Sequence, residues 1–189
     1  MSDIILKYQN ISILSIAILS SFACIYYNFV TDQTNFKFLQ AIICIFSIVD
    51  LYYNKSRDIK LHHLFSLGLF YYSFVFNVPC SDINILTYSF IKTEISSIFM
   101  VLKFYINKKS NLYHVNNIIF YILFFKLRVY DIYYDVINYD SQLYIIINKY
   151  SNFVGSFCFV LSCYGLFILN LYWFFLINKI MYKKLTLYR

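Results

Sequence analysis

Proline, glycine and charge are scarce in this chain of 189 residues. It contains one Pro and three Gly, and only 13% of its residues are charged. The turns of an all-β fold depend heavily on Gly and Pro, so their scarcity argues against that class. An average soluble domain is about 25% charged. This composition therefore also argues against a soluble protein.

Apolar side chains are abundant instead. Hydrophobic residues make up 61% of the chain and aromatic residues 23%, whereas about 45–50% of an average soluble domain is apolar. In lipid the backbone must satisfy its own polar groups, which only helices and closed barrels achieve. Barrel strands would alternate apolar and polar residues, but these segments are apolar on all sides. We therefore predict an all-α fold, a transmembrane bundle of about six helices around a polar-lined cavity, as a single domain over residues 1–189.

Six segments are long and apolar enough to be predicted as membrane spans. They cover residues 11–30, 36–53, 61–78, 83–106, 112–138 and 153–180. Lys7 precedes the first segment, as in a signal peptide. That segment is longer than a typical signal-peptide core and has no Ala-x-Ala cleavage site, so we interpret it as an uncleaved helix.

The basic residues are distributed unequally between the two ends of these spans. One side carries eleven of them: Lys7, Lys55, Arg57, Lys60, Lys103, Lys108, Lys109, Lys179, Lys183, Lys184 and Arg189. The other side carries Lys37 and Lys149. Because basic loops stay in the cytosol, both termini are expected there, and the sequon at Asn54 is expected to carry no glycan. The net charge of +7 does not indicate nucleic-acid binding, since the basic residues do not form one soluble face.

Polar side chains inside the spans are the candidates for a functional site, because lipid penalises ionisable groups unless they are paired or face a cavity. Two of the three histidines stand side by side at the cytosolic end of the third span. We predict that seven residues converge on the interior cavity. The predicted catalytic residues are His62, His63 and Ser66, and the predicted cavity residues are Asp50, Glu94, Lys126 and Arg128. Glu94 and Arg128 both lie near mid-membrane, and we expect them to pair.

A plainer interpretation stays open for most of these groups. Asp50 could pair with Lys60 near a helix end, and the Glu94–Arg128 pair could simply lock two helices together. The two histidines could face lipid headgroups, and so could Lys126.

No metal site is predicted. The three histidines have no Cys or carboxylate at ligand spacing, and the five cysteines contain no CxxC pair. We expect His114 at a membrane interface rather than at a metal. Trp173 and Tyr172 fit an aromatic belt at the bilayer surface.

Together these residues resemble the TLC-domain family, which includes ceramide synthases and translocation-associated TRAM proteins. The resemblance covers about residues 36–184. It rests first on His62-His63-Leu64-Phe65-Ser66, which is similar to the HHxxT pattern of the family with Ser in place of Thr. The supporting segments are Thr93-Glu94-Ile95-Ser96, Phe125-Lys126-Leu127-Arg128 and Leu171-Tyr172-Trp173.

The resemblance implies a lipid-related function. In ceramide synthases the paired histidines are implicated in moving a fatty acyl group from acyl-CoA to the amine of a sphingoid base. The expected protein is therefore a multi-pass component of lipid metabolism in the endoplasmic reticulum or a related endomembrane. Acyl-CoA would be its co-substrate, membrane lipids its partners, and no cofactor would be bound. Imidazole can deprotonate an amine or take up an acyl group, and the Ser66 hydroxyl could orient the ring of His62.

The chain departs from the ceramide synthases just before Glu94. Those enzymes carry an HDxxD-like acidic motif there, whereas residues 86–90 read Leu-Thr-Tyr-Ser-Phe. The Glu-x-Ser pattern resembles the less defined TLC branches, which are linked to membrane lipid composition or to trafficking. Two functions therefore stay open: an acyltransferase of ceramide-synthase type, and a non-enzymatic lipid-binding or trafficking factor. A channel or transporter is disfavoured, because Pro79 is the one proline and lies in a predicted loop.

Overall fold

The computed structural model describes residues 11, 13–16, 18–19, 37–54, 56–75, 88–138, 143–144, 147 and 153–187. All of the regular structure in these ranges is helical, so the predicted all-α fold is confirmed for them. The predicted loop that contains Pro79 and most of the predicted first span lie outside the described residues.

The helices follow the predicted spans closely. In chain order they are α2 (Lys37–Tyr53), α3 (Arg57–Val75), the 3₁₀ turn η1 (Lys92–Glu94), α5 (Ile95–Leu102), α6 (Asn111–Leu123), the π-helical segments η2 (Phe124–Tyr130) and η3 (Tyr133–Ile137), and α8 (Phe153–Leu187).

Three helix ends differ from the prediction. Helix α5 ends at Leu102, four residues before the predicted end at residue 106. Helix α3 begins at Arg57, inside the predicted basic loop, with Asp58 in its first turn. A carboxylate there stabilises the exposed N–H groups of a helix N-terminus, which explains the earlier start. Helix α8 continues to Leu187 instead of ending at Ile180.

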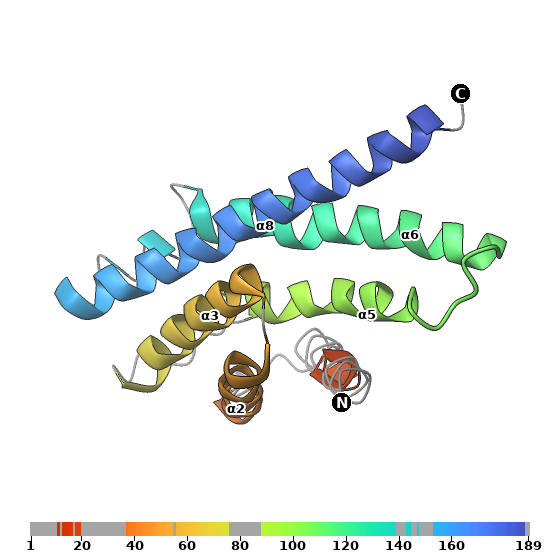
Figure 1. Cartoon of the computed structure of the whole chain (residues 1–189). Helices are drawn as coiled ribbons and strands as arrows, with labels where there is room; N and C mark the ends of the chain where they lie inside the picture. The colour runs from red at the N-terminus through yellow and green to blue at the C-terminus, as the bar shows by residue number, and fades with distance from the viewer. Residues whose placement is uncertain are drawn as a thin grey trace, which may run out of the picture.

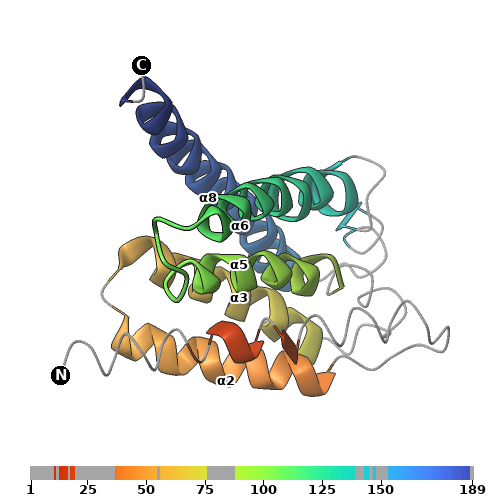
Figure 2. The ribbon, with the colours of Figure 1, turned by 90° about the vertical axis from the view of Figure 1, so that its right-hand side faces the viewer.

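Helix α3 packs mainly against α8 and α2, and α5 packs against α6. Figure 1 shows α3 between α2 and α8, with α5 and α6 running side by side. The C-terminal end of α8 projects past the other helices in Figures 1 and 2. The core between α3 and α8 is aromatic: the rings of Tyr72 and Phe159 stack with their centroids 4.5 Å apart.

Glycine permits the close approach of α3 and α8. A Cβ atom built on Gly165 would lie 2.6 Å from two atoms of the Phe65 ring and 2.7 Å from a third. A Cβ atom on Gly68 would lie 2.3 Å from the Ser162 hydroxyl oxygen. These distances are shorter than van der Waals contact, so a side chain at either glycine would require its neighbour on the other helix to move.

The variant Gly165→Ala is therefore expected to destabilise the protein. The added methyl group must displace the Phe65 ring, and overpacking of this kind costs about 1–3 kcal/mol. The measurement is the thermal unfolding midpoint of the detergent-solubilised protein. The double variant Gly165→Ala/Phe65→Leu removes the obstructing ring and should regain part of the loss. Equal midpoints for Gly165→Ala and wild type would contradict the packing.

One stretch within the described residues, Gly155–Lys183 of α8, is long and apolar enough to cross a bilayer. Its mean hydropathy is 1.9, and the apolar stretch Ala41–Tyr53 of α2 is shorter. The crossing of the bilayer by the other helices stays a prediction.

Candidate functional site

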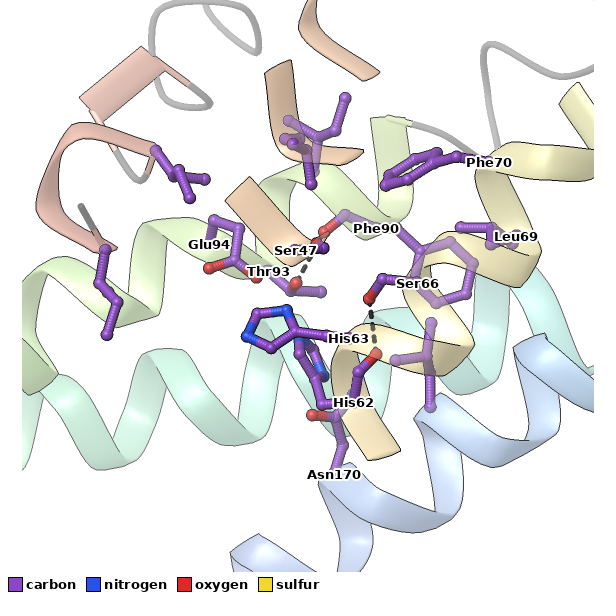
Figure 3. A pocket seen from close by; sticks show the side chains of 15 residues that line it. Ser47, His62, His63, Ser66, Leu69, Phe70, Phe90, Thr93, Glu94 and Asn170 are labelled. Carbon is purple, nitrogen blue, oxygen red and sulfur yellow. Dashed lines mark hydrogen bonds between the residues drawn. The ribbon is translucent and has the colours of Figure 1, made fainter. Parts of the chain in front are cut away.

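A cavity of about 90 Å³ lies where α2, α3, η1 and α8 meet, and Ile13 and Ile16 of the N-terminal segment also line it. Its polar wall consists of Ser47, His62, His63, Ser66, Thr93, Glu94 and Asn170. The remaining wall is apolar and includes Leu69, Phe70, Phe90 and Leu166. Figure 3 shows the two imidazoles at this cavity, with Glu94, Thr93 and Ser47 on one side and Asn170 on the other.

His63 is oriented by a carboxylate. Its Nε2 atom lies 2.7 Å from Oδ2 of Asp50, which comes from the last turn of α2. The same oxygen accepts a hydrogen bond of 3.1 Å from the Asn54 amide. A carboxylate has no proton to give, so Nε2 of His63 donates, and in the neutral ring Nδ1 then carries the lone pair. Asp50 thus pairs with His63, not with Lys60, and it acts beside the cavity without lining it.

His62 is held differently. Its ring lies 5.4 Å from the His63 ring and 5.4 Å from the Trp173 ring, measured between centroids. Its Nδ1 atom is buried and has no hydrogen-bond partner among the described residues. A buried polar atom without a partner is costly and uncommon.

The prediction that Ser66 orients the ring of His62 is wrong. The Ser66 hydroxyl donates a 2.9 Å hydrogen bond to the main-chain carbonyl of His62, one turn back along α3. A serine in a helix commonly bonds to the carbonyl four residues earlier, and here that bond competes with any bond to the ring. Ser66 is buried and still lines the cavity.

The predicted pairing of Glu94 with Arg128 is confirmed. The guanidinium Nη2 atom lies 3.3 Å from Oε1 of Glu94. Arg128 is only 5% exposed and also donates to the hydroxyls of Ser96 and Ser97 and to the Asn170 amide oxygen. The Ser97 hydroxyl in turn donates to the other oxygen of Glu94 at 3.0 Å. Glu94 lines the cavity. Arg128 lies behind Glu94 and neutralises the charge of its carboxylate.

Lys126 lies away from the cavity. Its side chain is 56% exposed and pairs with Asp131. A separate network holds Lys92, whose Nζ atom lies 2.7 Å from Asp135 and 3.3 Å from Asp131. The Ser89 hydroxyl also donates to Asp135. These groups join the fourth and fifth predicted spans, and none of them lines the cavity.

Asp58 and Trp173 form a contact that the sequence analysis missed. The indole Nε1–H of Trp173 donates a 2.8 Å hydrogen bond to Oδ2 of Asp58, across 115 residues of chain. The hydroxyl of Ser56, and more weakly this indole, lower the pKa of Asp58 below its ordinary value. Asp58 is therefore ionised at neutral pH, and its folded-state stabilisation is lost only when acid lowers the pH through that depressed pKa. The sequence analysis assigned Trp173 to an aromatic belt at the bilayer surface. The segment Leu171-Tyr172-Trp173 was nevertheless one of those that support the family resemblance.

No metal centre is formed by the described residues: no group of three or more His, Cys, Asp or Glu side chains there could hold an ion. His114 is exposed on α6, with its ring against Tyr113.

The comparisons with known proteins identify the family of the chain. The chain matches the family model described as TLC domain over residues 5–179. The match reaches further toward the N-terminus than the resemblance seen in the sequence. Neither the curated proteins nor the solved structures provide a match. Because the family model covers most of its length, the chain belongs to the TLC-domain family, a family of membrane proteins with lipid-related functions.

Proposed function

We propose that the protein transfers a fatty acyl group from a CoA thioester to a lipid amine, with His63 as the general base. The observation that supports this most is the 2.7 Å contact between His63 and Asp50. A base oriented by a third group is the arrangement that activates a nucleophile in acyl transfer. The carboxylate also stabilises the positive charge that the ring acquires when it accepts a proton.

The amine nitrogen of the lipid attacks the thioester carbonyl carbon, so a C–N bond forms and the C–S bond breaks. The proton leaving the nitrogen goes to Nδ1 of His63 and is then passed to the departing sulfur. The products are an amide and free CoA thiol. The low water content of a mostly apolar cavity would protect the thioester from hydrolysis.

The size of the cavity limits what it would hold. Pockets for whole drug-sized ligands measure about 300–1,000 Å³, whereas this one measures about 90 Å³. The reacting ends of two substrates fit such a space better than complete lipids do. The acyl and lipid chains would then extend between the helices into the bilayer.

The proposed topology supplies the donor from the cytosol. The basic residues gather on the side where α3 begins, with Arg57 and Lys60 in its first turns. CoA is an anionic cytosolic molecule, and a basic mouth would attract it. We place the protein, with several spans and cytosolic termini, in the endoplasmic reticulum or a related endomembrane.

A non-enzymatic lipid-binding or trafficking role is the second candidate. The specific observation in its favour is the absence of the acidic motif that ceramide synthases carry before the position of Glu94. In that case the cavity would bind a polar lipid end, and His63 would serve as a hydrogen-bonding group.

Lipid profiling separates the two candidates. Wild type and the double variant His62→Ala/His63→Ala would be expressed in cells that lack their own related protein. Acyl transfer predicts a new or increased amide lipid with wild type that the double variant fails to make at equal expression. His114→Ala is the matched control, since it removes an exposed histidine in the first turn of α6, which does not line the cavity. A lipid change that persists in the double variant would reject the catalytic role and leave lipid binding.

A further inference from the structure

The two histidines at the cavity are fixed in different ways. Asp50 holds His63 through a hydrogen bond to Nε2. Nδ1 of His62 has no such bond among the described residues, and the ring is bounded by the rings of His63 and Trp173. An imidazole can rotate about its side-chain torsions unless something restrains it. The ring contacts that the structure shows for His62 are those with His63 and Trp173.

Trp173 is itself restrained. It comes from α8, one turn after Asn170, so both side chains lie on the same side of the helix. Its indole N–H is tied to Asp58 in the first turn of α3, five residues before His63. The hydrogen bond thus connects the two helices that carry the site. It fixes the indole over His62 at the end of α3 where the basic residues gather.

We infer that Trp173 is a positioning residue: its hydrogen bond to Asp58 holds the indole against His62 and so fixes how that imidazole faces the cavity. The role rests on the proposed function wherever activity is the readout. Trp173 need not touch either substrate. It acts through His62, and Asp58 acts through Trp173.

A double-mutant cycle tests this order of action. Trp173→Phe keeps an aromatic ring but loses the N–H donor, and Asp58→Ala removes the acceptor. Each variant is expected to lower the rate of amide formation by about tenfold, the effect of roughly one lost hydrogen bond. Asp58→Asn keeps an acceptor oxygen and should retain most of the activity. Tyr172→Phe, at the exposed neighbouring position, is the control.

Repeating the Trp173→Phe substitution in the His62→Ala protein distinguishes a positioning role from general structural support. If Trp173 acts through His62, Trp173→Phe should cause no additional loss in the His62→Ala protein. A similar tenfold loss in both backgrounds would overturn the inference.

Fluorescence provides a readout that does not need the reaction. Trp173 is the one tryptophan in the chain, so the indole emission of the purified full-length protein reports this contact alone. The probe is iodide, which quenches exposed indoles. Asp58→Ala should raise the quenching constant several-fold and shift the emission to longer wavelength, whereas Asp58→Asn should resemble wild type. Equal quenching of wild type and Asp58→Ala would overturn the inference.

The activity measurement and the fluorescence measurement can fail independently of each other. Suppose that wild type forms no amide lipid, while quenching rises in Asp58→Ala but not in Asp58→Asn. The proposed reaction is then rejected, and the role of the Asp58 hydrogen bond in holding the indole is supported. If wild type is active and the quenching constants of wild type and Asp58→Ala are equal, the reaction is supported and the role of the Asp58 hydrogen bond in holding the indole is rejected.

Discussion

Replacing His63 with alanine is expected to lower the rate of amide formation by a factor of about 10²–10⁴, the usual contribution of a general base. The physical reason is the loss of an imidazole that a carboxylate orients beside the cavity. The measurement is the initial rate of CoA release from a fatty acyl-CoA, in vesicles containing the purified protein and a lipid amine. A His63→Ala protein with wild-type turnover would contradict the assignment.

The variant Asp50→Asn refines this expectation. An asparagine can still accept a hydrogen bond from Nε2 of His63, but it cannot stabilise the charged ring that forms during the reaction. Its rate should therefore fall between those of wild type and His63→Ala. In the double variant Asp50→Asn/His63→Ala, the first substitution should add little, because the two groups act as one unit. Independent losses would show that Asp50 has another role.

Replacing Arg128 with leucine is expected to have the largest effect on stability. It leaves the Glu94 carboxylate, whose side chain is 21% exposed, without its cationic partner. Removing one member of a buried ion pair costs about 3–5 kcal/mol. The Ser96 and Ser97 hydroxyls lose their guanidinium contacts as well. We expect a large drop in the unfolding midpoint of the detergent-solubilised protein.

Two further variants test the cause of that drop. Arg128→Leu/Glu94→Leu removes both charges and should recover much of the stability, since no unpaired charge then stays buried. Lys126→Leu removes a neighbouring cation that is mostly exposed, and its effect should stay within about 0.5 kcal/mol. If Arg128→Leu unfolded at the same temperature as Lys126→Leu, the ion pair would contribute nothing to stability.

The sequence was sufficient to predict the helices and part of the site. Long apolar segments bounded by polar loops locate helices well, because each pattern is local. The Glu94–Arg128 pair could also be predicted, since two opposite charges at similar depth in a lipid environment have few other partners. The contact between His63 and Asp50 was not predicted, although the two residues lie at facing ends of consecutive helices.

Other contacts could not be read from the sequence. The Asp58–Trp173 bond joins residues far apart in the chain, and it depends on how α8 crosses α3. That crossing depends on the seating of Phe65 against Gly165, which no periodicity reveals. Ser66 was misassigned for a local reason: a serine hydroxyl in a helix has a main-chain carbonyl within reach, and that acceptor competes with the side chain four residues away.

The length of α8 has a consequence for the membrane around it. Its stretch without charged residues, 155–178, would measure about 36 Å at 1.5 Å per residue, whereas the hydrocarbon layer is about 30 Å thick. Such a mismatch is relieved by tilting the helix or by locally thickening the bilayer. Because α8 also carries Asn170 and Trp173, its inclination and the geometry of the cavity are coupled. Thin and thick bilayers should therefore present the two imidazoles at different depths.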